Sequence, residues 1–181
     1  MVGLPPLNFV VTKQAIMIIG FMGSGKTTVG DALARLLDCR AIDLDSFITE
    51  REQRSPREII EHDGEAAFRG IETRALRQVL LEASAGVIAV GGGAWTVAEN
   101  RELIASEGGF TVWLDPSFEL CWKRIESGAE ARPLAPSREA AHALYAARRP
   151  VYELADARIP VDENDSAEEI ARKVIRAIGT T

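Results

Sequence analysis

The sequence contains little cysteine. Cys39 and Cys121 are the only two cysteines among 181 residues, too few for the disulfide framework of a small secreted domain. Neither has the closely spaced cysteine or histidine partners that a zinc site requires. We therefore expect two free thiols, buried or partly buried, in a cytoplasmic protein whose surroundings keep them reduced.

Long hydrophobic runs are also absent. No apolar stretch approaches the roughly 18 residues needed to span a bilayer, so no membrane partner is expected. The N-terminal residues lack the basic start and apolar core of a signal peptide, and Pro5 and Pro6 disfavour a helix there. Residues 1–14 are interpreted as a loosely held extension.

An excess of basic charge is missing as well. Acidic residues outnumber basic ones by 27 to 21, which gives a formal net charge of −6, and the two signs are interspersed. Nucleic-acid binding needs a basic surface that neutralises phosphates, so no nucleic-acid partner is expected. Hydrophobic residues make up 46% and charged residues 27% of the chain, which is typical of a globular domain. We expect one domain over residues 15–181, acting as a monomer.

Short apolar runs alternate with helical periodicity after residue 14. This alternation is typical of strand-helix-strand units around a parallel sheet. Strands are expected at residues 15–19, 41–43, 87–90, 110–114 and 157–161. The first is continuously apolar, as a central strand covered on both faces should be.

Helices are expected between these strands. In the first helix a single buried stripe is expected at helical spacing, formed by Val29, Ala32, Leu33, Leu36 and Leu37. Capping boxes at 55–58, 96–99 and 166–169, and Asp115-Pro116, mark further helix starts.

The region after residue 126 contains an expected loop and an expected helix. Residues 127–137 hold Gly128, Pro133 and Pro136 without periodicity. They predict a surface loop long enough to act as a lid. A helix should follow at about 138–149.

Residues 20–27, GFMGSGKT, fit the phosphate-binding pattern GxxxxGK[ST]. The motif follows an apolar strand and opens an amphipathic helix, as its mechanism requires. Backbone amides and the helix N-terminus can face phosphates, Lys26 can reach the β- and γ-phosphates, and the Thr27 hydroxyl can bind Mg²⁺. The alternative is a glycine-rich turn with a chance lysine. The motif alone does not name a reaction, although no Asn-Lys-x-Asp guanine-reading sequence is present.

Asp43 and Asp45 stand at the expected C-terminal end of the second strand, where ligands bind in open α/β sheets. In an extended chain their spacing would point both carboxylates the same way. One could hold hydrated Mg²⁺ while the other orients or deprotonates an acceptor hydroxyl. Alternatively, one or both cap the following helix.

Two further patterns are weak when taken alone. Arg69 and Glu72 have the spacing of an i, i+3 ion pair, which most often faces solvent. Gly91, Gly92 and Gly93 follow the third strand and would let a ligand approach the backbone amides, unless they form a plain flexible turn.

Two arginines near the expected lid are equally open to two interpretations. Arg132 lies in the lid, where an arginine can swing onto transferring phosphates or merely solubilise the loop. Arg148 ends the expected helix just before Arg149-Pro150. Neither interpretation is favoured by these residues alone.

Taken in order, the motifs resemble those of the shikimate kinase family, over nearly the whole chain after residue 14. They are GFMGSGKT, Asp43-Leu-Asp45, Phe68-Arg69-x-x-Glu72, Gly91-Gly92-Gly93, Arg132-Pro133-Leu134 and Arg148-x-Pro150-x-Tyr152. The resemblance implies an α/β chain with the three-layer α/β/α P-loop NTPase fold and a five-stranded parallel sheet. A substrate-binding region would lie at about 45–75 and a lid at about 127–137. The implied reaction is transfer of the ATP γ-phosphate to the 3-hydroxyl of shikimate, with ATP and Mg²⁺.

The resemblance also implies roles for individual residues. Thr27 and Asp43 would serve Mg²⁺, Lys26 and Arg132 would stabilise the transferring phosphoryl group, and Asp45 would contact the acceptor hydroxyls. The residues implied at the nucleotide are Gly23, Ser24, Gly25, Lys26, Thr27, Thr28, Arg132 and Arg124, the last stacked on adenine. Those implied at the acceptor are Asp45, Arg69 and Arg148, the two arginines on its carboxylate, and the backbone of Gly91, Gly92 and Gly93.

One departure and two alternatives accompany this interpretation. Family lids usually continue with another leucine where this chain has Ala135-Pro136, which puts lid packing and turnover in doubt. A related P-loop kinase such as gluconate kinase is the nearest alternative, although the paired aspartates and the triple glycine weigh against it. A non-catalytic shikimate or nucleotide sensor is the other, although residues 1–13 could not form the DNA-binding module that such a sensor would carry.

Overall fold

A five-stranded parallel sheet lies at the centre of the computed structural model, which describes residues 14–82, 85–128 and 134–179. Its strand order is β2-β3-β1-β4-β5. The strands are β1 (Ile16–Ile19), β2 (Arg40–Asp43), β3 (Ala85–Ala89), β4 (Phe110–Pro116) and β5 (Ala157–Val161). Each expected strand is thus present, with ends that differ by two residues or fewer. The edge strand β5 accommodates Pro160, which cannot donate to a ladder.

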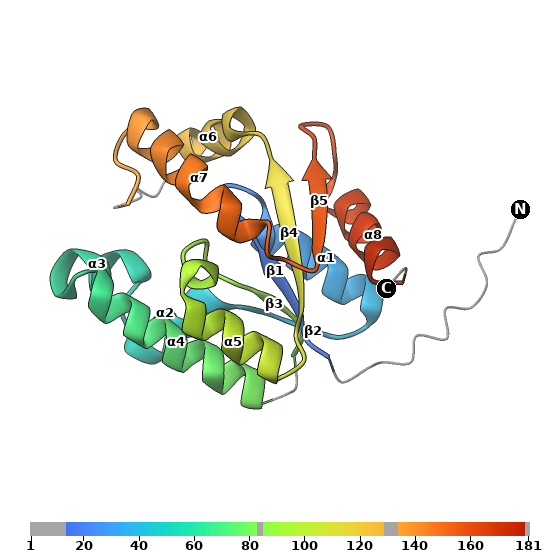
Figure 1. Cartoon of the computed structure of the whole chain (residues 1–181), viewed down its shortest axis with the longest axis horizontal. Helices are drawn as coiled ribbons and strands as arrows, with labels where there is room; N and C mark the ends of the chain where they lie inside the picture. The colour runs from blue at the N-terminus through green and yellow to red at the C-terminus, as the bar shows by residue number, and fades with distance from the viewer. Residues whose placement is uncertain (1–13, 83–84, 129–133, 180–181) are drawn as a thin grey trace, which may run out of the picture.

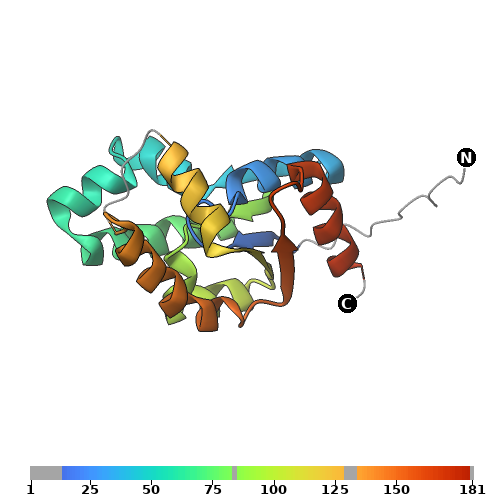
Figure 2. The same cartoon turned by 90° about the horizontal axis from the view of Figure 1, so that it is seen from above.

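Helices cover both faces of the sheet, so the expected three-layer α/β/α architecture is confirmed (Figures 1 and 2). On one face α1 (Lys26–Leu37) and α8 (Ala167–Ile178) pack against each other and the sheet. The other face is covered mainly by α4 (Glu65–Leu81), α5 (Ala98–Ser106) and α7 (Arg138–Tyr152). The remaining helices are α2 (Leu44–Glu52), α3 (Pro56–Asp63), the short 3₁₀ helix η1 (Ala94–Thr96) and α6 (Phe118–Ser127).

The central strand divides its side chains between two cores. Met17 and Ile19 join the core beneath α4, α5 and α7, whereas Ile16 and Ile18 join the core beneath α1 and α8. All four side chains are buried. This alternation is the period of two that an extended chain imposes, and burial on both faces is why the strand is continuously apolar.

The buried stripe expected in α1 is wrong at one position. Val29, Ala32 and Leu33 are buried and Leu37 packs at the edge of the core, but Leu36 is 39% exposed. Leu36 lies in the last turn of α1, which leads directly into the exposed residues 38–40. The expectation that both cysteines are at least partly buried is also wrong for one of them. Cys121 is buried, but Cys39 lies in this exposed segment after α1 and is exposed.

Two of the expected capping boxes are present and two expected helix starts are wrong. Boxes form at Ser55 and at Ser166. The box expected at 96–99 does not form, because η1 occupies residues 94–96 and the Thr96 hydroxyl donates to the carbonyl of Gly93 (2.6 Å). Strand β4 continues through Pro116, so Ser117 caps α6 in place of Asp115.

Helix α7 is longer than expected. It continues through Pro150 to Tyr152, although the sequence predicts that it ends at 149. The loop expected at 127–137 is described at Gly128 and at residues 134–137, whereas residues 129–133, with Arg132 among them, lie outside the described residues.

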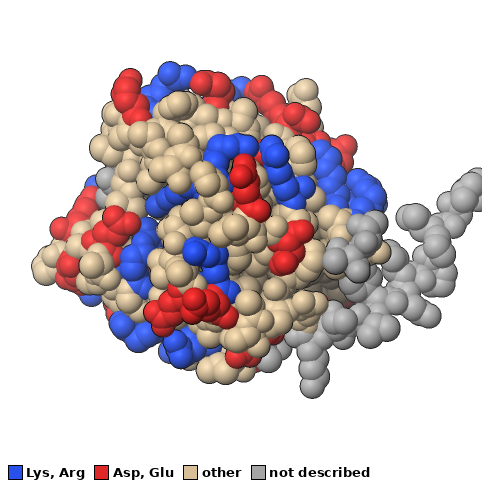
Figure 3. Space-filling model, in the orientation of Figure 1, with Lys and Arg blue, Asp and Glu red and all other residues tan. Residues whose placement is uncertain are grey.

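The surface carries mixed charge. Lysine, arginine, aspartate and glutamate side chains are interspersed over the face shown in Figure 3, with no continuous basic band. This agrees with a chain in which acidic residues are in excess. Among the described residues, no helix is both long enough and apolar enough to cross a membrane.

Candidate active site

The phosphate-binding motif forms the loop between β1 and α1, at the carboxyl edge of the sheet. Gly23 has φ 75° and Gly25 has φ 93°, conformations that L side chains rarely adopt. A Cβ atom added to Gly23 would also lie 2.6 Å from the carbonyl oxygen of Cys121. Gly25 is the N-cap of α1 and supplies no side-chain cap, so the first-turn amides of the helix can bind a ligand.

This loop borders a cavity of about 240 Å³ at the carboxyl edge of the sheet. Its walls also include Asp43 and Asp45 and the backbone that follows β3. The lining residues are Met22, Gly23, Gly25, Lys26, Thr27, Thr28, Asp43, Asp45, Ala89, Val90, Gly91 and Gly92. Residues far apart in sequence therefore meet here as expected, because the carboxyl ends of parallel strands share one edge.

Two cations lie along the loop. The Lys26 ammonium donates to the carbonyl of Phe21 (2.9 Å), which holds it over the loop. Arg124 reaches the loop from α6 and donates to the carbonyl of Gly23 (3.1 Å). Ser24 is fully buried within the loop, where its backbone amide donates to the carbonyl of Phe21 (3.1 Å).

Thr27 and Asp43 lie together on one wall of the cavity. The Thr27 hydroxyl donates to Asp43 Oδ2 (2.6 Å), while Asp43 Oδ1 accepts from the backbone amide of Ser46 (2.9 Å) and so caps α2. Both interpretations of Asp43 are therefore compatible with its position. A hydroxyl beside a carboxylate suits Mg²⁺, which takes few protein ligands and keeps several waters. The described residues contain no cluster of three or more histidine, cysteine or acidic side chains placed to hold a metal.

Asp45 is not arranged as the sequence predicts. It lies in the first turn of α2, not in extended chain, so the helical rotation separates its direction from that of Asp43. Asp43 points at Thr27, whereas a Cβ atom added to Gly91 would lie 3.1 Å from Asp45 Oδ1. The two aspartates therefore serve different parts of the cavity.

The ion pair of Arg69 and Glu72 does not face solvent, which was the alternative that its spacing alone left open. Arg69 donates to Glu72 Oε2 (2.6 Å) and also to Glu65 (2.9 Å). The Glu72 side chain is 1% exposed and that of Arg69 is 18% exposed. Burial raises the pKa of Glu72 to about 7 even though the charge of Arg69 opposes this.

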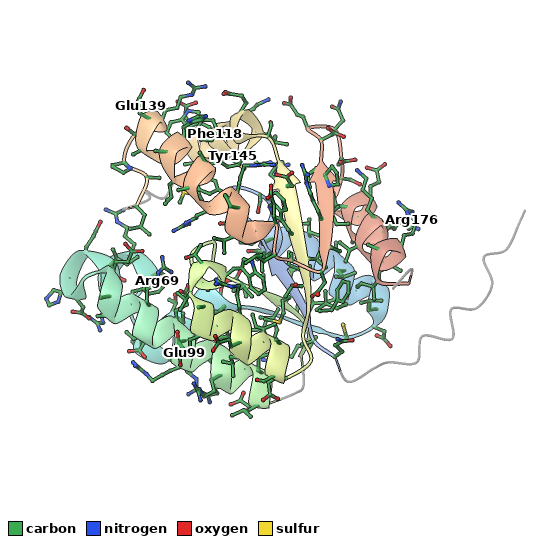
Figure 4. The ribbon with its side chains drawn as sticks, in the orientation of Figure 1. Arg69, Glu99, Phe118, Glu139, Tyr145 and Arg176 are labelled. Atoms are coloured by element: carbon green, nitrogen blue, oxygen red, sulfur yellow. The ribbon has the colours of Figure 1, made fainter. Side chains whose placement is uncertain are left out.

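The three glycines form a surface against which these charged side chains pack. A Cβ atom added to Gly93 would collide with the guanidinium of Arg69, and one added to Gly91 would lie 2.8 Å from Glu72 Oε1. Arg69 projects from α4 toward this loop (Figure 4). Close approach, not simple flexibility, therefore requires the glycines.

Arg148 reaches the same loop from α7. It is buried, and a Cβ atom added to Gly92 would lie 3.5 Å from its NH1 atom. Its charge also acts on Glu72. The structure thus brings Asp45, Arg69 and Arg148 together around the glycine loop, from three helices.

Two residues that sequence reasoning missed hold the glycine loop to α7. The Tyr152 hydroxyl donates to the carbonyl of Gly92 (2.6 Å), and Trp95 Nε1 donates to the carbonyl of Val151 (2.9 Å). Burial raises the pKa of Tyr152 to about 12, so it stays a neutral donor. The only sequence signal was the position of Tyr152 four residues after Arg148, which does not reveal its partner.

The chemistry of this site suits a small polyhydroxy anion next to a nucleotide. Arginine forks bind a carboxylate in a planar, bidentate manner. A carboxylate such as that of Asp45 accepts hydrogen bonds from hydroxyl groups and can take a proton. The phosphate-binding loop lies in the same cavity as Asp45.

Comparison with known proteins gives consistent results. The family model for shikimate kinase matches residues 22–179. A shikimate kinase of Ruegeria pomeroyi is 39% identical over 170 residues, which cover 92% of this chain and 86% of the relative. One of Geobacter sulfurreducens is 42% identical over 168 residues, covering 91% and 88%.

Solved structures agree with this. A shikimate kinase of Acinetobacter baumannii in complex with shikimate superposes with a TM-score of 0.82 at 34% identity, covering 92% of this chain and 93% of that one. A gluconokinase of Sinorhizobium meliloti superposes with a TM-score of 0.59 at 17% identity, covering 93% of each chain. At that identity the gluconokinase shares the fold alone.

Proposed function

Because this chain belongs to the shikimate kinase family, we infer that it transfers the γ-phosphate of ATP to the 3-hydroxyl of shikimate, giving shikimate 3-phosphate and ADP. It is an ATP-dependent phosphotransferase with an alcohol acceptor, and shikimate is its small-molecule substrate. One observation carries this function: Arg69, Arg148 and Asp45 converge on a glycine loop that borders the same cavity as the phosphate-binding loop.

We propose that residues 23–28 bind the phosphates of ATP. The backbone amides at the start of α1 would face the phosphates, and Lys26 would follow the negative charge that develops on the transferring group. Arg124 would contact the adenine, a role supported by its place on α6 beside the loop. Arg132 as the lid arginine stays a prediction, because it lies outside the described residues.

We propose that Thr27 and Asp43 hold Mg²⁺ when the nucleotide binds. The adjacent hydroxyl and carboxylate oxygens are the support for this assignment. A bound Mg²⁺ would neutralise charge on the phosphate oxygens. Asp43 would keep its second oxygen on the amide of Ser46, which fixes the carboxylate toward Thr27.

On the acceptor side, the proposal gives each charged residue one task. Arg69 and Arg148 bind the carboxylate of shikimate, and the amides of Gly92 and Gly93 meet its ring hydroxyls. Asp45 orients the 3-hydroxyl toward the γ-phosphate and accepts its proton as the new oxygen–phosphorus bond forms. Catalysis would then rest on positioning and on electrostatic stabilisation.

Two of these acceptor residues, Asp45 and Arg69, belong to the region at about 45–75 that was expected to bind the substrate. Arg148 and the glycine loop complete the site from outside that region. A ligand held between these elements would touch α2, α4, α7 and the β3–η1 loop together. We further propose that the protein acts as a monomer, because a single chain supplies both the phosphate-binding loop and the arginines at the glycine loop.

The test of this function is acceptor specificity. Arg69→Lys and Arg148→Lys keep the positive charge but lose the planar fork, so each should raise the Michaelis constant for shikimate by about 10-fold or more. The Michaelis constant for ATP should stay within a few-fold of the wild-type value. Arg77→Lys is the matched control on the same helix, since Arg77 pairs with exposed Glu99 away from the glycines.

Steady-state ADP release should be measured with shikimate, gluconate and nucleoside monophosphates as acceptors. Shikimate should give the highest kcat/KM by a wide margin. A preference for gluconate would leave the kinase assignment intact but would show that shikimate is not the substrate. A protein that binds shikimate and ATP but releases no ADP would be the non-catalytic sensor instead.

A further inference from the structure

Arg149 is a charged residue next to the acceptor-binding Arg148 that the proposed function leaves without a role. Its guanidinium forms a fork on Asp115, with NH1 to Oδ1 at 2.7 Å and NH2 to Oδ2 at 3.3 Å. NH1 also donates to the Tyr145 hydroxyl (2.8 Å), and the group lies over the ring of Trp113 (5.0 Å). Together these contacts hold the Arg149 guanidinium in one defined position.

The partner of Arg149 belongs to the central sheet. Asp115 stands near the end of β4, and its side chain is 6% exposed. Strand β4 pairs with β1, with Trp113 opposite Ile19, directly before the phosphate-binding loop. The fork of Arg149 therefore fixes α7 to the same sheet edge that carries the nucleotide site.

Helix α7 needs such a contact because of Pro150. A proline within a helix has no amide hydrogen, so the carbonyl of Ala146 loses its usual partner, and the ring disfavours the preceding turn. The helix is therefore intrinsically weakest where it carries Arg148. It nevertheless continues to Tyr152, where the bonds from Trp95 and Tyr152 hold its far side to the glycine loop.

We propose that Arg149 is a positioning residue for the acceptor: its fork on Asp115 fixes the last turns of α7 on the sheet and so holds Arg148 in the direction that binds the acceptor carboxylate. Arg149 itself touches neither substrate. The inference rests on the proposed function, because it needs Arg148 to bind the acceptor.

A purely structural role predicts a different outcome. If Arg149 only stabilised the fold, its loss would lower the free energy of unfolding and leave the kinetics of folded molecules unchanged. A positioning role predicts a selective loss on the acceptor side, because misplacing a substrate-binding group by about 1 Å can cost up to about 100-fold in rate.

Arg158→Gln is the matched control for this test. Arg158 also donates to Asp115 Oδ2, at 2.8 Å from Nε, and also lies over Trp113 (5.0 Å). It comes from β5, however, and makes no link to α7. Removing it perturbs the same carboxylate and the same ring without freeing the helix.

The experiment measures kcat/KM for shikimate and for ATP, the dissociation constant of shikimate by calorimetry without nucleotide, and urea unfolding. Arg149→Gln should lower kcat/KM for shikimate and weaken shikimate binding by roughly 10-fold, with the ATP constant within two-fold. Asp115→Asn should do the same, and combining the two substitutions should cause little further loss.

Arg149→Lys keeps one ion pair, so its shikimate kinetics should lie between those of wild type and of Arg149→Gln. It carries the test if Arg149→Gln does not fold. Arg158→Gln should stay within two-fold of wild type.

Two results would overturn the proposal. One is an Arg149→Gln variant of lower stability whose shikimate kinetics stay within two-fold of wild type. The other is an Arg158→Gln variant that loses as much shikimate affinity as Arg149→Gln, since the effect would then belong to Asp115 and not to α7. An unsubstituted protein that does not phosphorylate shikimate at all would instead remove the proposed function, and the inference with it.

Discussion

The charged side chains around the glycine loop are two arginines and two carboxylates, so their charges nearly cancel. Arg69 and Arg148 face Glu72, and Asp45 adds a second carboxylate whose charge also acts on Glu72. A net charge of −6 over the whole chain would repel a small anion, so its binding depends on these local donors. Glu72 is almost completely shielded from water, with a side chain that is 1% exposed, and its carboxylate pairs with the Arg69 guanidinium at 2.6 Å.

The first prediction concerns the pH dependence that Glu72 gives to stability. Its pKa in the folded protein, about 7, lies above the ordinary value near 4.5. The folded state therefore holds this proton more tightly than the unfolded state, and the resulting stabilisation is complete below about pH 4.5 and is lost as pH rises through 7. Relative to Glu72→Gln, wild type should lose about 3 kcal/mol of unfolding free energy across that interval.

Urea unfolding of both proteins at half-unit steps from pH 5 to pH 8 measures this difference. Glu61→Gln is a suitable control, because Glu61 is exposed and pairs with Arg57 on the surface of α3. A difference between wild type and Glu72→Gln that stayed constant, or grew in favour of wild type as pH rose, would contradict the prediction.

The second prediction separates the two aspartates. Asp45→Asn keeps the shape of the side chain but cannot accept the hydroxyl proton, so kcat should fall by about 10² to 10⁴ while ATP binding stays nearly normal. Asp43→Asn should instead raise the Mg²⁺ concentration needed for half-maximal rate. Steady-state kinetics at varied ATP and Mg²⁺ decide between them. If Asp45→Asn is the variant that weakens Mg-ATP binding, the two roles have been exchanged.

At the scale of elements, the ends of three strands supply the loops of the site, and two helices supply its arginines. Strand β1 ends in the phosphate-binding loop, β2 ends at Asp43, and β3 ends in the glycine loop. Helices α4 and α7 then bring one arginine each from opposite parts of the sequence. Helix α8 packs against α1 on the other face of the sheet, and none of its residues lines the cavity.

The third prediction concerns the N-terminal cap of α8, which lies away from the cavity. The Ser166 hydroxyl accepts from the amide of Glu169 (3.2 Å), and the Glu169 carboxylate accepts from the amide of Ser166 (2.8 Å). Ser166→Ala should therefore cost about 1 kcal/mol of unfolding free energy. The kinetic constants should not change, because α8 contributes no residue to the site. A loss of activity in the folded variant would show that α8 is coupled to catalysis.

At the scale of the whole molecule, two cores on either side of the sheet hold the site together. The described buried residues of the core beneath α1 and α8 are all aliphatic, with the half-buried Phe110 packed against them, whereas the other core contains Phe21, Trp95, Trp113 and Tyr152. Tyr145 packs between α7 and the start of α6, edge to face with Phe118 at 5.5 Å (Figure 4). The aromatic side is the side that carries Arg69 and Arg148, and its rings supply hydrogen-bond donors as well as apolar area.

The fourth prediction compares two leucines three residues apart in α1. Leu33 is fully buried, so Leu33→Ala should lower the unfolding free energy by about 2–5 kcal/mol. Leu36 is exposed, so Leu36→Ala should change it by no more than about 0.5 kcal/mol. Urea unfolding measures both. Equal losses would mean that the stripe expected from the sequence, with Leu36 buried, is correct in solution.

Periodicity and spacing alone determined the strands, the alternation of strands with helices around a parallel sheet, and the phosphate-binding loop, whereas the three-layer architecture was expected from the family resemblance. These features are local, because a period of two or 3.6 and the backbone needs of glycine and proline act over a few residues. The capping boxes at Ser55 and Ser166 were predictable for the same reason. The box expected at Thr96 failed because its residues found partners elsewhere: Thr96 on Gly93, and Glu99 on Arg77.

Burial and long-range partners were decided only by the tertiary structure. An i, i+3 spacing cannot say whether Arg69 and Glu72 face water, and it took α4 lying against the glycine loop to bury them. The direction of Asp45 was set by the start of α2 at Leu44, which places Asp45 in helical and not in extended backbone. Helix α7 passes through Pro150 because Asp115, Trp95 and Gly92 contact it from three other elements. Such contacts join residues tens of positions apart, and no local pattern records them.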